Sequence, residues 1–128
     1  MPPTRTIGQG ADAYTEVLKN FTGIPKHLVQ GIQRIIEQEK IADPKVKAGD
    51  IYGALLFDII AAHRSGEKIV WLGQMSPGPD ALPIQVWIKE EVTTEFERFC
   101  AEIQRPQGVV LITALERYLH HQAGKGGP

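Results

Sequence analysis

The sequence lacks the features that typically place a protein outside the cell or in a membrane. Its single cysteine, Cys100, excludes a disulfide within the chain and fits a reducing cytoplasm. No apolar run approaches the roughly 18 residues of a membrane-spanning segment. The N-terminal residues MPPTRTIGQG contain no apolar stretch of the kind found in signal peptides. We therefore expect a bacterial cytoplasmic protein that contacts no membrane.

An excess of either charge is also missing. The chain has 14 Lys and Arg against 15 Asp and Glu, which gives a formal net charge of -1. Proteins that bind polyanions without selectivity typically carry a large positive charge, so this composition argues against such a protein. Any contact with nucleic acid must use a local basic surface. Hydrophobic residues make up 42% of the 128 residues, which is enough for one domain with a core.

Arrangements typical of enzymes and metal sites are absent as well. We find no nucleophile–base pair and no convincing carboxylate pair. The GQG at residues 8–10 lacks the third glycine and the preceding strand of a dinucleotide fingerprint. His120 and His121 are neighbours that point about 100° apart on a helix, with no third ligand evident. We expect no enzyme, no metal and no cofactor, and a packing role for Cys100 on an apolar helix face.

What the sequence does contain is a strand of strict alternation, at the start of PIQVWIKEEVTTEF (residues 83–96). One face is aliphatic and the other is polar or aromatic. The aliphatic residues are Ile84, Val86 and Ile88, and the opposite face carries Gln85, Trp87 and Lys89. This period of two predicts a half-buried strand. The outward row is either an ordinary solvated sheet face or a surface that recognises a ligand, and the pattern alone leaves both open.

Four segments carry helical periodicity, and they form two similar pairs. The first helices of the pairs share apolar spacing 0, 4, 7, 8, and the second helices share 0, 1, 4, 5, 8, 9. The first set is Leu28, Ile32, Ile35 and Ile36 against Val92, Phe96, Phe99 and Cys100, and the second is Ile51, Tyr52, Leu55, Leu56, Ile59 and Ile60 against Val110, Leu111, Ala114, Leu115, Tyr118 and Leu119. The first helices are 64 residues apart and the second 59, with the difference in an inter-helix loop.

We interpret this pattern as a tandem strand-helix-helix repeat within a single domain, residues 1–128. The repeats would span residues 16–66 and 83–122, joined by a linker at residues 67–82 that ends in a run rich in proline and glycine. Residues 1–13 are expected to be a loose lead-in. Neither half can bury its apolar faces alone, so we expect the two strands to pair antiparallel with four helices packed around them.

The segment QVWIKEEVTTEFERFCAEIQRPQGVVLITALERY (residues 85–118) resembles a ribbon-helix-helix DNA-binding unit of the Arc, MetJ and CopG type. The match to the CopG pattern runs without a gap, whereas the first half resembles the unit only through its helices. Members of this family are normally dimers of such units. A chain with both units resembles the rarer single-chain members, which include an accessory protein of T-DNA transfer. The implied fold is mainly α with a two-stranded antiparallel ribbon, a tandem ribbon-helix-helix pseudodimer.

The resemblance implies sequence-specific binding of double-stranded DNA, with the ribbon in the major groove. The protein would act as a transcriptional repressor or as an accessory factor in plasmid or T-DNA transfer, with other DNA-processing or transfer proteins as partners. The implied base-reading residues are Gln85, Trp87 and Lys89 in the second strand and Lys19 and Phe21 in the first. The family also binds phosphates at the start of each second helix. The matching residues are Lys45, Lys47 and Gly49, and Arg105, Gln107 and Gly108.

Two features leave alternatives open. Trp87 replaces the usual small polar or basic residue, and its indole could meet a thymine methyl group or could cover the ribbon and block the groove. In the alignment of the two repeats, the 64-residue offset matches Gly23 with Trp87 and turns Asn20 and Thr22 inward. The first strand therefore has either this register or a one-residue slip or bulge. Besides DNA binding, we consider a protein-interaction module that kept the scaffold and lost DNA, and self-association through Trp71 or Trp87.

Overall fold

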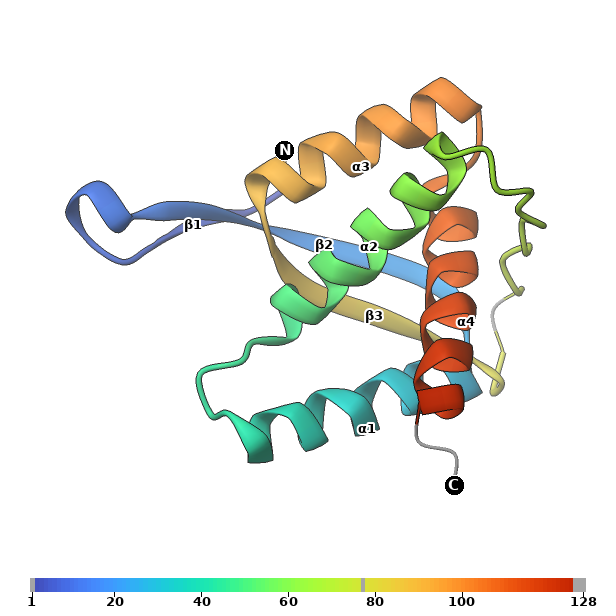
Figure 1. Cartoon of the computed structure of the whole chain (residues 1–128), viewed down its shortest axis with the longest axis horizontal. Helices are drawn as coiled ribbons and strands as arrows, with labels where there is room; N and C mark the ends of the chain where they lie inside the picture. The colour runs from blue at the N-terminus through green and yellow to red at the C-terminus, as the bar shows by residue number, and fades with distance from the viewer. Residues whose placement is uncertain (1, 77, 126–128) are drawn as a thin grey trace.

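The computed structural model describes residues 2–76 and 78–125 of the chain (Figure 1). The elements are β1 (Thr4–Ile7), a 3-10 turn η1 (Gly10–Asp12), β2 (Tyr14–Pro25), α1 (Lys26–Ala42), α2 (Ala48–Arg64), β3 (Ala81–Lys89), α3 (Glu90–Ile103) and α4 (Gln107–Lys125). The four helices lie where the apolar spacing predicts them. Residues 68–73, in the linker, form no strand.

The predicted fold class is wrong in its sheet, which has three antiparallel strands in the order β1-β2-β3 and not two. β1 pairs with the start of β2, from Thr4 opposite Val17 to Ile7 opposite Tyr14. The expected loose lead-in is therefore a hairpin that projects beyond the helices at the left of Figure 1. Its threonines and isoleucine favour an extended backbone, and the positive φ of 82° at Gly8 helps the chain turn back. A simple tandem of ribbon-helix-helix units does not describe this chain.

β2 and β3 pair antiparallel as expected, but in the alternative register. Asn20 lies opposite Gln85 and Leu18 lies opposite Trp87. The outward residues of β2 are therefore shifted by one from Lys19 and Phe21, which the 64-residue offset predicts to face outward. An irregularity between Phe21 and Ile24 follows, and Gly23 within it has a φ of 71°. Because side chains of directly opposed residues share a face, Leu18 and Asn20 lie with Trp87 and Gln85 on the outward side.

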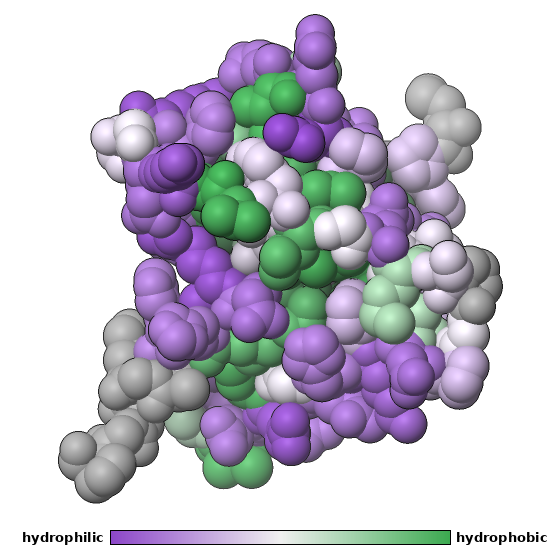
Figure 2. Space-filling view, turned by 90° about the vertical axis from the view of Figure 1, so that its right-hand side faces the viewer, coloured by the Kyte–Doolittle hydropathy of each residue, from purple (hydrophilic) through white to green (hydrophobic). Residues whose placement is uncertain are grey.

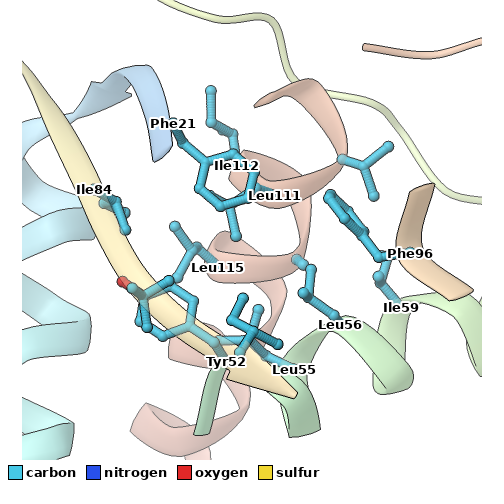
Figure 3. Packing of buried hydrophobic residues seen from close by; sticks show 14 of the residues in the cluster. Phe21, Tyr52, Leu55, Leu56, Ile59, Ile84, Phe96, Leu111, Ile112 and Leu115 are labelled. Atoms are coloured by element: carbon cyan, nitrogen blue, oxygen red, sulfur yellow. The ribbon is translucent and has the colours of Figure 1, made fainter. Parts of the chain in front are cut away.

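The core lies between the inward face of the sheet and the four helices. Figure 3 shows side chains from β2, β3, α2, α3 and α4 around one common centre. Those labelled are Phe21, Tyr52, Leu55, Leu56, Ile59, Ile84, Phe96, Leu111, Ile112 and Leu115, all of them buried. Each large apolar side chain in such a core contributes about 1.5–3 kcal/mol relative to exposure. Because the core lies on one side of the sheet only, the helices leave the opposite face of the sheet uncovered.

Candidate nucleic-acid interface

A hollow of 710 Å³ opens beside the outward face of the sheet, between β3 and the loop that joins α1 to α2. Four cationic side chains line it, and the one carboxylate among its lining residues is that of Glu16. The cations are Arg5, Lys40, Lys45 and Lys47. We call this hollow the basic groove. It also includes Gln85, Trp87 and Gly49, so the groove brings together five of the residues predicted to contact DNA from two distant parts of the chain.

Gly49 is what allows the first turn of α2 to lie so close to β3. An ideal Cβ built on Gly49 would overlap the backbone carbonyl oxygen of Trp87. The amides of a first helical turn have no partner within the helix, and the helix dipole makes this end attractive to anions. The Asp50 carboxylate accepts a hydrogen bond from the Lys47 amide at 3.2 Å, and the Asp50 amide donates to the Lys47 carbonyl oxygen at 3.0 Å, so two of the donors at this helix start are already used.

Tyr14, at the start of β2, holds two lysines near the basic groove. The Nζ of Lys47 donates to the Tyr14 hydroxyl at 3.0 Å and lies 5.5 Å from its ring centroid. This hydrogen bond raises the pKa of Lys47 above its ordinary value. From β3, the Nζ of Lys89 lies 5.1 Å from the same ring. The sequence pattern missed Tyr14 because β2 begins earlier than expected.

Two amide side chains face outward on the sheet. Gln85 and Asn20 are directly opposed across β2 and β3, and both are exposed. Gln85 is where the alternating pattern predicts it. Asn20 was expected inward by the 64-residue offset, and only the one-residue slip could have indicated its outward position. The pair offers adjacent donors and acceptors on an open surface.

Trp87 is neither fully exposed nor a simple cover over the outward face of the sheet. Its ring is half-buried, and the guanidinium of Arg5 lies over it, with Cζ 4.2 Å from the ring centroid. The same guanidinium donates through Nε to the Oε1 of Glu16 at 2.8 Å. Glu16 is only 3% exposed, so this is a largely buried carboxylate with its cation beside it. Arg5 was missed because its strand, β1, was not predicted.

Two residues predicted to read bases lie on the helix side of the sheet. Phe21 is buried and packs edge-on against Phe96 with ring centroids 6.1 Å apart. Lys19 is opposite Val86, its side chain is 13% exposed, and its Nζ donates to the Oε1 of Gln107 at 2.7 Å. The slipped register turns both side chains inward, away from the outward face on which base reading was predicted.

The second predicted phosphate site, at the start of α4, is covered by the linker. An ideal Cβ on Gly108 would overlap the side-chain amide of Gln74, which itself donates to the backbone oxygen of Thr22 at 3.0 Å. Gln107 is engaged by Lys19, and a proline at position 106 supplies no amide hydrogen. Arg105 remains exposed. Arg105 and Gly108 lie beside the start of α4, as the sequence predicts, but Gln74 covers this helix start.

A second hollow, of 330 Å³, lies among α2, the linker and α4. It includes the exposed Val70, and Figure 2 shows apolar atoms gathered in the middle of the face that carries α4 and the linker. Its arginine, Arg117, pairs with both Glu67 and Asp58. The paired carboxylates leave this hollow without the positive character of the basic groove.

Within residues 2–76 and 78–125, no helix combines the length and apolar character needed to cross a bilayer. The same residues contain no group of three or more His, Cys, Asp and Glu side chains close enough to hold a metal ion. Comparisons with protein-family models, with curated proteins and with solved structures found no match to this chain.

Proposed function

We propose that the protein binds double-stranded DNA selectively, through the outward face of β2 and β3 and the basic groove beside it. One observation carries this proposal: groups that can read bases and groups that can bind phosphates occur on the same side of the molecule. The outward amides of Asn20 and Gln85 supply the first kind, and Lys45 and Lys47 supply the second. Specific DNA binding needs both, since phosphate contacts position a protein and base contacts select the sequence.

The chemistry of these groups suits a major groove. A side-chain amide can make two hydrogen bonds to adenine N6 and N7, and an antiparallel pair of strands is narrow enough to enter the groove. Lys40, Lys45 and Lys47 lie along the basic groove, at the flank where a DNA backbone would pass. This local basic surface supplies the attraction that the overall charge of -1 does not.

The biological role we propose is transcriptional repression or assistance in plasmid or T-DNA transfer, within a bacterial cytoplasm. The resemblance of residues 85–118 to ribbon-helix-helix proteins supports DNA binding, and the chemistry needs no cofactor. Neighbouring genes would distinguish the roles. Relaxase or secretion genes would favour a transfer function, with proteins of that machinery as partners, and a toxin gene would favour an antitoxin.

The test is fluorescence anisotropy with duplexes selected from a random pool, over about 50–200 mM salt. We expect affinity to fall steeply with salt. Lys45→Ala and Lys47→Ala should each weaken binding to all sequences and reduce the salt slope by about one. Lys68→Ala is the matched control, because this exposed lysine lines the second hollow and not the basic groove. Absence of binding at low salt, or an equal effect of Lys68→Ala, would contradict the proposal.

A protein-interaction module is the second candidate function. The observation that favours it is the apolar centre of the face shown in Figure 2. Val70 is exposed and lines the hollow between α2 and α4. Exposed apolar side chains rimmed by polar ones are typical of protein contacts. If Val70→Asp abolishes association with a partner while duplex binding is absent in the parent protein, this second function replaces the first.

A further inference from the structure

Arg5 belongs to the strand that the sequence did not predict, yet it lies on the outward face. It is opposite Glu16 in the β1–β2 pairing, and it lines the basic groove together with Gln85 and Trp87. Its side chain is 43% exposed. The third strand therefore adds an arginine to the surface that we propose to contact DNA, within the same hollow as one of the outward amides.

Two contacts fix the guanidinium of Arg5 in one orientation. Its Nε donates to Glu16 at 2.8 Å, and its Cζ lies over the Trp87 ring at 4.2 Å from the centroid. A flexible arginine normally loses much side-chain freedom when it binds a ligand, and a guanidinium already held by a carboxylate and an indole loses less. Among the described residues, the bond to Glu16 is the one hydrogen bond that this guanidinium makes. The two Nη atoms keep their hydrogens for a ligand.

The carboxylate of Glu16 decides between two kinds of acceptor. The Arg5–Glu16 pair carries no net charge, so it offers little attraction to a phosphate compared with Lys45 and Lys47 at the flank, which form no ion pair within the described part of the chain. Its free Nη donors still form a planar fork. Such a fork matches the O6 and N7 acceptors of guanine in the major groove, which belong to a neutral base and suffer little repulsion from Glu16.

We infer that Arg5 reads guanine, and that Trp87 and Glu16 are positioning residues that hold it. This inference rests on the proposed DNA binding and deepens it, since it names a base and a residue from β1. The DNA site then contains a guanine near the base pair read by Gln85 and Asn20. The role of Trp87 is to support the reading arginine, which differs from both contact with thymine and closure of the face.

The experiment compares Arg5→Lys with the parent protein on duplexes selected by the parent. Lysine keeps the charge and the aliphatic stem but lacks the planar fork, so we expect preference for guanine at one position to fall about tenfold or more. The salt slope should stay unchanged. Replacing that guanine by 7-deazaguanine removes the N7 acceptor, and it should weaken the parent protein but not Arg5→Lys. Trp87→Leu should reduce the preference by a smaller factor.

Arg64→Lys is the matched control. Arg64 has a similar exposure of 49% and a similar partner, Glu95 at 2.7 Å, but these residues belong to α2 and α3 on the helix side. We expect this variant to keep the guanine preference. If Arg5→Lys keeps it too, or weakens all sequences equally with a lower salt slope, Arg5 does not read guanine although DNA binding stands. If the parent protein binds no duplex, the proposed function itself is wrong.

Discussion

The first turns of α2 and α4 have comparable positions in the chain but different surroundings. Each follows a basic residue and contains a glycine. The start of α2 lies against β3, and the start of α4 lies against β2. At α2 the surroundings are open and form the basic groove with Lys45 and Lys47. At α4 the linker residue Gln74 lies against Gly108. Similar local sequence therefore gives two unlike flanks, because a distant segment covers only one of them.

The difference has a consequence for recognition. If DNA contacts follow the open surface, phosphates are bound at the α2 flank and far less at the α4 flank. The outward residues of β2 and β3 also differ, with Leu18 opposite Trp87 and Asn20 opposite Gln85. A site read by such a surface is asymmetric and has no need to be a palindrome.

The largest expected contrast between the flanks is in stability. Gly49→Ala would place a methyl group on the Trp87 carbonyl, and a backbone atom cannot move without disturbing the sheet. We expect this overpacking to lower the free energy of unfolding by about 2–3 kcal/mol. Gly108→Ala meets only the flexible end of Gln74, and alanine also favours the helix. Its effect should be under about 1 kcal/mol in urea titrations followed by circular dichroism. Equal losses of unfolding free energy in the two variants would show that both helix starts pack equally tightly against their neighbours.

The next contrast concerns DNA affinity at the two flanks. Lys47→Ala should reduce the salt slope of duplex binding by about one, because it removes a phosphate contact in the open groove. Arg105→Ala removes a cation beside the covered helix start and should leave the slope almost unchanged. Salt-dependent anisotropy with one common duplex measures both. A larger effect of Arg105→Ala would reverse the assignment of the open and closed flanks.

The smallest effect is expected from opening the covered flank. Gln74→Ala removes the amide that lies against Gly108 and donates to Thr22. The start of α4 should then accept an anion, so duplex affinity should rise by a few-fold and the salt slope should increase slightly. Gln30→Ala, an exposed glutamine on α1, serves as the control and should change neither quantity. Unchanged affinity for Gln74→Ala would mean that the linker does not limit binding.

Much of the fold followed from local patterns. β3 was predicted because one of its faces is aliphatic at every second residue, and the helices were predicted because apolar residues recur at helical spacing. β1 was missed because four residues of mixed character form a strand only by pairing with β2, which no local pattern records. The sequence left the register of β2 open between the 64-residue offset and a one-residue slip or bulge, because the irregularity at Gly23 ends the simple correspondence between the two halves.

The candidate site was predicted in the same uneven way. Gln85, Lys45 and Lys47 come together because they are tied to well-predicted elements, β3 and the start of α2. Lys19 and Phe21 were misplaced by a single residue of register, which turns a side chain to the other face of a sheet. Arg5, Tyr14 and Asn20 were not predicted, since each depends on pairings involving β1 or on the true register of β2.

The most direct test of the DNA-binding surface is a titration of the labelled protein with a selected duplex, followed by amide chemical shifts in NMR spectra. We predict shifts at Arg5, Asn20 and Gln85 and along residues 45–49, with much smaller changes at residues 105–108 and around Val70. A duplex that perturbs residues 105–108 or the face around Val70 and leaves residues 45–49 unchanged would contradict this account of the protein.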